Sequence, residues 1–427
     1  MNSNLAPLAR ICTTRLRALL TVFTVTLLVT SVRAATEKVL HKFNNTDGAI
    51  PFSSLIFDAA GNLYGTTVDG GNTASCDSDG CGTVFELTPK TGGGWKETVL
   101  HRFVSGTKDG HFPHAGVVFD ASGNLYGTTA FGGSGPCTDG CGTVFELMPP
   151  KSGGWTEKLL HSFTGKDGRY AEAALVFDAS GNLYGTTPVG GAYDYGTVFE
   201  LTRKSGGTWA AKVLRSFKDG YGSYGSLVFD SSGNLYGTTG GGGTYNYGTV
   251  FELTPSAGGQ WTETVLHNFN GTDGLQPLAG LILNKGVLYG TTLSGGAYGG
   301  GTVFEVSLKT GAAWAEKVLY SFCYSFFHSC PNGSGPQASL IVDASGNLFG
   351  TTASGGSTRC SEVGCGTVFE VTPDGSGGWT EHALYGFGRQ TGGIVPEAGL
   401  IFDATGNLYG TASNNGAGYG TGFEIMR

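Results

Sequence analysis

The chain has 427 residues, including 76 glycines and only 14 prolines, and its formal net charge at pH 7 is −8. This composition excludes a collagen-like chain and a proline-rich tail, and an apolar content of 39% is enough to build a packed core, which argues against disorder. The low, acidic charge disfavours binding to nucleic acid and to anionic membranes.

The first 34 residues have the pattern of a secretory signal peptide. Arg10, Arg15 and Arg17 form a basic region, residues 18–32 are apolar, and small residues precede a predicted cleavage point after Ala34. The alternative is an uncleaved membrane anchor, but the apolar run is short for a span of about 20 residues. We therefore expect an exported protein, extracellular or periplasmic, with no stable membrane insertion once the signal has been cleaved.

Two phrases recur seven times after this segment. The first reads Gly-Asn-Leu-Tyr-Gly-Thr-Thr, with small variations, and its copies lie 52 to 62 residues apart; they begin at Gly61, Gly123, Gly181, Gly233, Gly286, Gly346 and Gly406. The second, Gly-Thr-Val-Phe-Glu-Leu, follows each copy at Gly82, Gly142, Gly196, Gly248, Gly301, Gly366 and, as Gly-Thr-Gly-Phe-Glu, at Gly420. A chain of this length would ordinarily contain two or three domains, but an uninterrupted repeat predicts one domain over residues 35–427.

One copy of the repeat predicts four antiparallel strands. In the third copy the predicted strands are residues 173–178, 183–187, 196–201 and 209–217, and the first two are joined by a tight Asp-Ala-Ser-Gly-Asn hairpin. Four strands followed by recurrence are typical of a β-propeller blade, whereas a β-helix would recur at a much shorter period.

The ends of the repeat predict how the ring closes. Residues 39–43 form a fourth strand with no blade of their own, and residues 420–424 form a third strand with no successor. We therefore predict an all-β, seven-bladed β-propeller of four-stranded blades, in which the N-terminal strand completes the last blade and removes an exposed edge. A monomer is expected.

The Asp-x-x-Gly-Asn-Leu-Tyr phrase resembles the blade hairpin of NHL and gluconolactonase-like propellers. The whole unit, ending in Gly-Thr-Val-Phe-Glu-Leu, is similar to the GloVer tandem repeats of secreted bacterial proteins, which are grouped under a "choice-of-anchor" label. This resemblance covers essentially the whole mature chain and implies an extracellular bacterial protein, with no established activity to transfer. Members of that group often end in an anchoring tail, and residues 423–427 do not resemble one.

Eight cysteines remain after the signal, in four close pairs. Disulfides are predicted because each pair lies within one loop of an exported chain; zinc would need four converging ligands, and the pairs lie in different repeats without accompanying histidines. Loops this short gain little stability from cross-linking, so the bridges are expected to stiffen the loops. The pairs are Cys76 and Cys81, Cys137 and Cys141, Cys323 and Cys330, and Cys360 and Cys365.

Most residues that recur in every repeat are interpreted as structural. The glutamate of the third strand is expected to accept hydrogen bonds from a neighbouring threonine, tryptophan or backbone group, and the aspartate of the hairpin is expected to cap the turn. Histidine at one position of the fourth strand alternates with arginine and tyrosine, which indicates packing; these histidines are His41, His101, His161 and His267. No catalytic residue, cofactor or metal site is predicted.

Residues that differ among the repeats are better candidates for a binding site. In a propeller of this strand order, the loops from a fourth strand to the next first strand share one face with the loops between second and third strands. The loops of that face carry the aromatic and polar residues suited to adaptable binding or to stacking on sugar rings. The candidates are His111, His114, Arg169, Tyr170, Glu172, Tyr193, Tyr195, Tyr221, Tyr224, Tyr245, Tyr247 and Glu397, with Asp69, Phe131, Gln276, Tyr298, Gln337 and Tyr419 on the same loops.

Three functions remain open at this stage. The first is a binding or scaffolding module for a polysaccharide or an extracellular protein, supported by the tyrosine-rich face and by the lack of a catalytic motif. The second is a lactonase- or lyase-type enzyme, which would need His111, His114, Glu172 and Glu397 to converge, although they come from different repeats. The third is a purely structural extracellular component.

Overall fold

The computed structural model describes residues 35–76, 78–150, 153–308, 313–324, 330–356, 364–388, 393–415 and 417–427. The predicted signal peptide, residues 1–34, lies outside this part of the chain and stays a prediction. Over the ranges described, no helix is long and apolar enough to cross a membrane.

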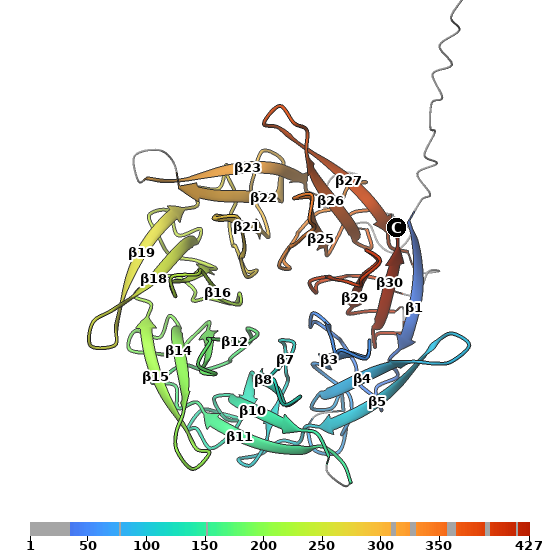
Figure 1. Cartoon of the computed structure of the whole chain (residues 1–427), viewed down its shortest axis with the longest axis vertical. Helices are drawn as coiled ribbons and strands as arrows, with labels where there is room; N and C mark the ends of the chain where they lie inside the picture. Colours follow the sequence, from blue (N-terminus) through green and yellow to red (C-terminus); the bar gives the residue numbers. More distant parts are fainter. Residues whose placement is uncertain are drawn as a thin grey trace, which may run out of the picture. The chain divides into compact units, whose positions relative to one another are not determined.

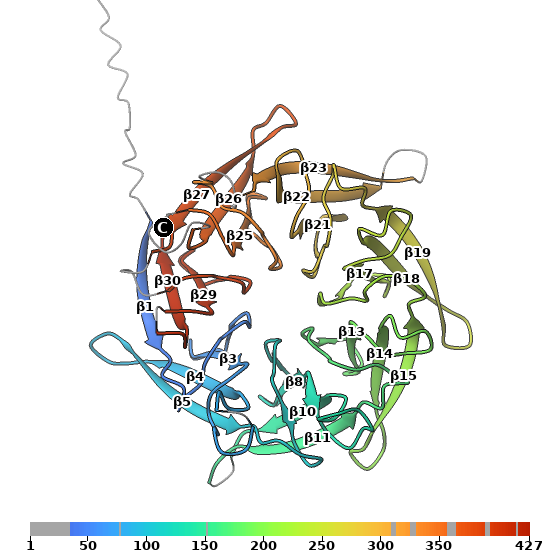
Figure 2. The same cartoon turned by 180° about the vertical axis from the view of Figure 1, so that it is seen from behind.

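The described residues form seven four-stranded antiparallel sheets around a central channel, which confirms the predicted seven-bladed β-propeller (Figures 1 and 2). Within each blade the first strand is innermost and the fourth is outermost. The strands of the first four blades are β2 (Ile56–Phe57), β3 (Leu63–Thr67), β4 (Thr83–Pro89) and β5 (Trp95–Arg102); β7 (Val118–Phe119), β8 (Leu125–Thr129), β10 (Thr143–Met148) and β11 (Thr156–Ser162); β12 (Val176–Phe177), β13 (Leu183–Thr187), β14 (Thr197–Arg203) and β15 (Trp209–Ser216); and β16 (Val228–Phe229), β17 (Leu235–Thr239), β18 (Thr249–Ser256) and β19 (Gln260–Asn268).

The last three blades repeat this arrangement, and the ring closes as predicted. Their strands are β20 (Ile282–Asn284), β21 (Val287–Thr292), β22 (Gly299–Leu308) and β23 (Trp314–Cys323); β24 (Ile341–Val342), β25 (Leu348–Thr352), β26 (Thr367–Pro373) and β27 (Trp379–Gly386); and β28 (Ile401–Phe402), β29 (Leu408–Ala412), β30 (Thr421–Met426) and β1 (Thr36–Lys42). Strand β1 pairs antiparallel with β30, so the two ends of the repeat share one sheet. In Figure 1 the blue β1 lies beside the red β30.

The innermost strands are shorter than the sequence predicts. The predicted strand 173–178 is reduced to the two residues of β12, and the fourth strand agrees with β15 to within one residue. An innermost strand has a hydrogen-bonding partner on one side only, since its other side faces the channel. The residues just before the innermost strand therefore belong to the interblade loop and not to the sheet.

The two recurring phrases fit together within each blade. The glycine of Leu-Tyr-Gly-Thr-Thr lies opposite the phenylalanine of Thr-Val-Phe-Glu, as Gly185 does opposite Phe199. A Cβ on Gly185 would approach Phe199 Cζ to 2.6 Å, so the ring occupies the place of a side chain, and the same closeness recurs in all seven blades. Because the phenylalanine ring lies over the glycine of the adjacent strand, the two phrases occur together in each blade.

The core lies between neighbouring blades and not within them. Phe199 of β14 is 1% exposed and packs edge-to-face against Phe163, which follows the outer strand of the preceding blade, with ring centroids 5.1 Å apart. The same pair occurs at every blade boundary, with centroid distances of 5.0 to 5.3 Å. Edge-to-face pairs add to the burial of apolar area, so each phenylalanine joins two sheets.

The first threonine of the Gly-Thr-Thr phrase also joins neighbouring blades. Its hydroxyl donates to a backbone carbonyl of the next blade's inner segment over 2.8 to 3.2 Å in all seven blades. Thr411 of the last blade donates to Ser53 of the first and so closes the ring. The second threonine instead pairs with the threonine that opens the third strand, as Thr187 does with Thr197.

The last blade lacks this second pair. Ala412 takes the place of the second threonine, and the hydroxyl of Thr421 is buried without a hydrogen-bond partner. We expect Ala412→Thr to raise the free energy of unfolding by about 1 kcal/mol, because it restores the hydrogen bond. Urea denaturation compares it with Ala412→Val, which adds the same bulk without a hydroxyl; equal effects of the two variants would contradict this reason.

The recurring glutamate and aspartate are structural, as predicted, but the donor to the glutamate differs from the expectation. The hydroxyl of Tyr184, from the Asn-Leu-Tyr phrase, donates to Glu200 at 3.0 Å and contacts Asp178 at 3.2 Å. Asp178 also accepts the backbone N–H groups of Ser180 and Asn182, which closes the hairpin. In this blade tyrosine is the main donor, since it lies directly across from the glutamate in the strand register. In the sixth blade Phe349 takes the place of the tyrosine, and Arg427 donates to Glu370.

Candidate functional site

Two sets of loops meet on one face of the propeller. The interblade loops, which run from a fourth strand to the next first strand, pair through short β-bridges with the loops between second and third strands. Ala49 bridges Asp69, Arg169 bridges Val189, and in the second blade the bridge extends to β6 (Gly110–His111) and β9 (Phe131–Gly132). These bridges place the two sets of loops together, as the sequence analysis assumed.

One residue from each interblade loop reaches the mouth of the central channel. We call these seven residues the channel ring. They line a cavity of about 240 Å³ and occupy equivalent positions of the repeat: Phe52, His114, Glu172, Tyr224, Leu278, Gln337 and Glu397. The seven positions hold six different side chains, whereas the strand and hairpin residues are nearly identical in every repeat. The ring is therefore a place where the repeats differ from one another.

In five of the seven blades a strained backbone residue precedes the ring residue. Two positions before the ring residue, most blades have a residue with a left-handed backbone, such as Ile50 with φ 54° and Val395 with φ 62°. Branched side chains strongly disfavour this conformation, so the surrounding structure must hold it in place. Val395, for example, donates its N–H to Cys365 and accepts a hydrogen bond from Ser413.

The channel wall below the ring is made of small residues. The second residue after each ring position is glycine, alanine or serine, and these positions line the deeper cavity of about 250 Å³. A Cβ on Gly116 would approach the carbonyl oxygen of Ser54 to 2.6 Å, and one on Gly280 would approach that of Ser226 to 2.8 Å. The blades therefore converge closely at the axis, and the ring residues supply the large side chains of the mouth.

The ring has an aromatic side and a hydrogen-bonding side. The rings of Phe52 and His114 stack with centroids 6.0 Å apart. Around the ring, Gln337 Nε2 donates to Glu397 Oε1 at 2.6 Å, and Ser413 Oγ donates to Glu397 Oε2 at 2.9 Å. This arrangement offers stacking faces next to oriented carboxyl and amide groups.

Burial shifts the pKa values of the ring towards uncharged forms. It lowers the pKa of His114 to about 4 and raises the pKa of Glu172 to about 7. Burial also raises the pKa of Glu397, against the effect of the Ser413 and Gln337 hydrogen bonds, and that of Tyr224, with a further contribution from the charge of Glu172. The ring carries no cationic side chain at neutral pH, so it suits a neutral ligand better than an anion.

Glu172 should make the stability depend on pH. The folded-state pKa of about 7 lies above the usual 4.5, so the folded protein holds the proton longer and the free energy of unfolding falls as pH rises between these values. Through Glu172, the free energy of unfolding of the wild type should fall by about 1–2 kcal/mol between pH 5 and pH 8, a figure reduced for the solvent at the mouth. Glu172→Gln should lack this fall. Urea denaturation at pH 5 and pH 8 measures the slope, and identical slopes in both proteins would show that Glu172 is not responsible.

Four of the twelve principal candidates from the sequence lie in the channel ring, and the rest lie elsewhere on the face. His114, Glu172, Tyr224 and Glu397 line the same cavity, together with Gln337. His111 is buried and lines a separate cavity of about 320 Å³ with Phe112, Phe131, Asp139 and three residues of the neighbouring loops. The structure therefore brings His114 and Glu172 together but leaves His111 out of the channel.

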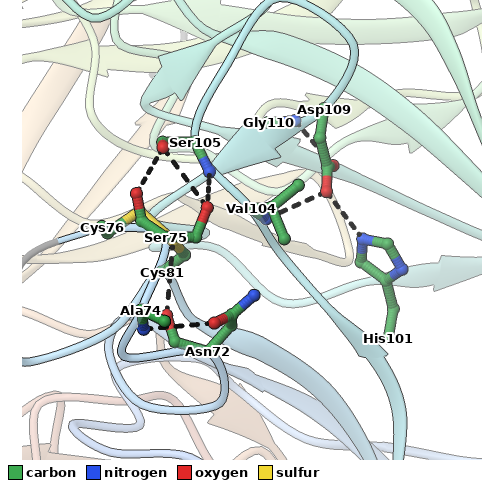
Figure 3. The surroundings of a disulfide bond; sticks show 10 residues. All are labelled: Asn72, Ala74, Ser75, Cys76, Cys81, His101, Val104, Ser105, Asp109 and Gly110. Carbon is green, nitrogen blue, oxygen red and sulfur yellow. Dashed lines mark hydrogen bonds and ion pairs between the residues drawn. A yellow bond between two sulfur atoms is a disulfide. The ribbon is translucent and has the colours of Figure 1, made fainter.

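Cys76 of the first disulfide is among the residues that line the second cavity. Figure 3 shows the surroundings of this disulfide. Ser105 of the interblade loop donates its N–H to the hydroxyl of Ser75, which precedes Cys76, and its own hydroxyl to the Ser75 carbonyl. In the same interblade loop, Asp109 accepts the N–H groups of Val104 and Gly110. Loop-to-loop contacts thus hold this cavity.

The remaining tyrosines are spread over the loops and do not converge. Tyr221 is 64% exposed, and the exposed tyrosines among the candidates are Tyr193, Tyr195, Tyr221, Tyr245, Tyr247 and Tyr298. Arg169 pairs with Asp194 at 3.1 Å and lies over the ring of Tyr170 at 5.4 Å. Tyr170 and Gln276 occupy the left-handed position before the ring, with φ 58° and 57°, and so they position a ring residue instead of joining it. Of the other candidates on these loops, Tyr419 packs against a buried cluster.

Two ring residues were missed by the sequence analysis. Phe52 and Leu278 are apolar and were not among the candidates, but they line the cavity beside the polar members. Aligning the seven repeats at the residue that follows Pro51, Pro113, Pro277, Pro336 and Pro396 finds both of them, because the ring residue comes next in each case.

Three of the predicted disulfides are present in the described residues. They join Cys76 to Cys81, Cys137 to Cys141 and Cys323 to Cys330. Cys360, of the fourth predicted pair, lies outside the described residues. Three disulfides within short loops indicate an oxidising, extracellular-type environment.

Comparisons with solved structures find propeller-like chains of low sequence identity. They include a protein of unknown function from Dyadobacter fermentans (12% identity, TM-score 0.45, 82% of this chain and 97% of that chain covered) and a gluconolactonase from Xanthomonas campestris (14%, 0.39, 76% and 88%). A mutant puromycin hydrolase in complex with PGG also matches (13%, 0.49, 83% and 48%). At these values none of them carries a functional argument.

Sequence comparison identifies the repeat itself. No curated protein matches the chain. The model of the Gloeobacter/Verrucomicrobia repeat matches residues 21–152, 71–281 and 258–427, which confirms the resemblance to the GloVer repeats. Because these segments together span most of the chain, the protein belongs to the Gloeobacter/Verrucomicrobia repeat family.

Proposed function

We propose that this propeller is an exported binding module whose channel ring takes a small, neutral, hydroxyl-rich group, such as one sugar unit of a polysaccharide. The observation that carries the proposal is the channel ring itself, in which seven equivalent positions of a near-identical frame hold six different side chains. In this proposal the ring positions differ because each contacts a different part of the ligand.

The chemistry of the ring supports this ligand class. Phe52, His114 and Tyr224 offer aromatic faces for stacking, and Glu397 and Gln337 offer oriented groups for hydroxyls. A cavity of about 240 Å³ lies below the range of about 300–1,000 Å³ that is typical of sites for drug-sized ligands, so it suits one small unit and not a long segment. The exposed tyrosines around the mouth would contact the rest of a polymer.

Binding to an array of neutral and acidic polysaccharides tests the proposal. We expect a neutral polysaccharide to bind, Tyr224→Ala to weaken its binding at least tenfold, and Glu397→Gln to weaken it less. Tyr193→Ala and Tyr245→Ala are the matched controls on the outer loops and should weaken binding only a few-fold. Lack of binding to every polymer, or equal losses in the ring and outer-loop variants, would count against a ring-centred site.

A second function has one specific observation in its favour. The pKa of Glu172 is raised to about 7 by burial, and a carboxyl with this pKa in a cavity is suited to general acid–base chemistry. A lactonase or lyase of this kind would turn over lactones or acidic polysaccharides, and Glu172→Gln would abolish that turnover. Polysaccharide binding without turnover favours the binding module.

A further inference from the structure

The outer rim of the propeller contains a second set of equivalent positions. At each blade boundary, the end of an outer strand meets the interblade loop and the outer strand of the next blade; we call this a rim interface. Two rim interfaces bring together a histidine, an aspartate and a glutamate, namely His41, Asp47 and Glu97, and His267, Asp273 and Glu316. In each set, one ligand atom of every residue lies within 4.8 Å of the others.

The histidine and the aspartate are already paired in both sets. His41 Nε2 lies 3.1 Å from Asp47 Oδ2, and His267 Nε2 lies 3.0 Å from Asp273 Oδ2. Ligand atoms of a tetrahedral Zn²⁺ site lie about 2.0–2.2 Å from the metal, hence roughly 3.3–3.6 Å from one another. Small side-chain rotations would therefore bring all three residues into a coordinating geometry.

The glutamate in each set lacks a hydrogen-bonding partner. Oε1 of Glu97 and Oε1 of Glu316 are buried atoms without any hydrogen bond among the described residues. A buried carboxylate oxygen beside a second carboxylate is costly unless a positive centre lies between them. Oε1 of Glu157 and Glu381, at the equivalent positions of other rim interfaces, is also buried without a partner over the described ranges. The two sets are therefore distinguished by the histidine and the aspartate that lie within 4.8 Å of the glutamate.

The aspartates are held in place by a shared surrounding pattern. Asp47 and Asp273 each end an Asn-x-Thr-Asp sequence, and the side-chain amide of the asparagine donates to the same Oδ2 that faces the histidine. The threonine hydroxyl in turn donates to the asparagine Oδ1. Partners that orient a metal ligand in this way are usual around metal centres.

Some of the other rim interfaces have arginine or tyrosine in place of the histidine. Where arginine replaces the histidine, Arg215 contacts Glu263 directly and supplies the positive charge. Where tyrosine replaces it, Tyr320 and Glu381 share the amide of Asn332, so the glutamate has a neutral donor. One oxygen of the glutamate therefore has a positively charged or neutral donor at these two interfaces, although Oε1 of Glu381 stays without a partner among the residues described.

Two further interfaces are incomplete versions of the same set. His161 pairs with Asp167 at 2.9 Å, but the exposed Ala211 takes the position of the glutamate. His101, Asp109 and Glu157 have the right types, yet their ligand atoms do not all lie within 4.8 Å, and their interblade loop is longer by two residues. Only two interfaces are therefore complete in the described part of the chain.

We propose that the two complete rim interfaces each bind one divalent transition-metal cation, Zn²⁺ by preference, through His41, Asp47 and Glu97 and through His267, Asp273 and Glu316. One imidazole and two carboxylates suit Zn²⁺ better than Ca²⁺ or Mg²⁺, which prefer oxygen ligands alone. Each cation would link two blades. The first would also fasten β1, which carries His41, to the first blade and so strengthen the closure of the ring.

Metal stoichiometry tests the proposal on the mature protein. After dialysis against a chelator, the protein is equilibrated with low micromolar Zn²⁺, and bound metal is measured by mass spectrometry after gel filtration. We expect two Zn²⁺ per chain, one in Glu97→Gln or Glu316→Gln, and none in the double variant. Glu381→Gln, at a tyrosine interface, is the matched control and should keep two.

A gain of metal provides a test that does not depend on removing a ligand. Ala211→Glu adds the missing carboxylate beside His161 and Asp167 and should raise the stoichiometry to three. Thermal melts in EDTA report whether each variant is folded, and Zn²⁺ should raise the melting temperature of the wild type but not of the double variant. Less than one Zn²⁺ in the wild type, two in the double variant, or a preference for Ca²⁺ would overturn the proposal.

Discussion

A protein that begins at residue 44, and so lacks β1, is expected to lose its stable ring. Leu40 and Phe43 are 7% and 2% exposed, and burying two such side chains contributes about 3–6 kcal/mol. Their removal also leaves β30 without its antiparallel partner. The combined loss is comparable with the whole stability of a typical domain, about 5–15 kcal/mol, so the truncated chain should melt far lower or aggregate through its open edge.

A peptide that replaces β1 should restore the stability of the truncated protein. A peptide of residues 35–45, added in excess, should pair with the free edge of β30 and restore the cooperative melt, as other strands complete a sheet from outside. A scrambled peptide of the same composition is the control. Thermal melts and gel filtration give the readout; a truncated protein as stable as the one that begins at Ala35 would show that β1 does not close the ring.

The second large effect is expected from Phe199→Ala. Phe199 covers Gly185 within its blade and packs on Phe163 of the preceding blade. Truncation of a fully buried phenylalanine costs about 3–5 kcal/mol, and the glycine opposite offers no side chain to fill the cavity, so the upper part of that range is expected.

Urea denaturation of Phe199→Ala measures this loss. Leu308→Ala removes an apolar side chain that is 56% exposed and should change the free energy of unfolding by less than about 0.5 kcal/mol. A loss below about 1.5 kcal/mol in Phe199→Ala would mean that the blades do not depend on the aromatic pairs at their boundaries.

The repeat determined the fold because the same local pattern occurs seven times. The Asp-x-x-Gly-Asn hairpin is specified by nearby groups alone, since Asp178 binds backbone N–H groups two and four residues later. The unpaired strands at residues 39–43 and 420–424 likewise predicted the closure that β1 and β30 make. The short innermost strands were not predicted, because their length depends on which backbone groups face the channel.

The candidate sites depended on contacts between blades, which the sequence does not show. Sequence reasoning found His114, Glu172, Tyr224 and Glu397 as variable loop residues. It set His111 beside them and omitted Phe52, because the loop conformations that sort these side chains into two cavities are not apparent from residue type. It assigned His41 and His267 to packing, and only the arrangement of neighbouring outer strands brings them within reach of an aspartate and a glutamate.

The sequence by itself therefore determined the frame, which is built from local turns and strand patterns. The tertiary structure decided which side chains meet in the channel and at the rim, because each of those groups joins residues from different blades.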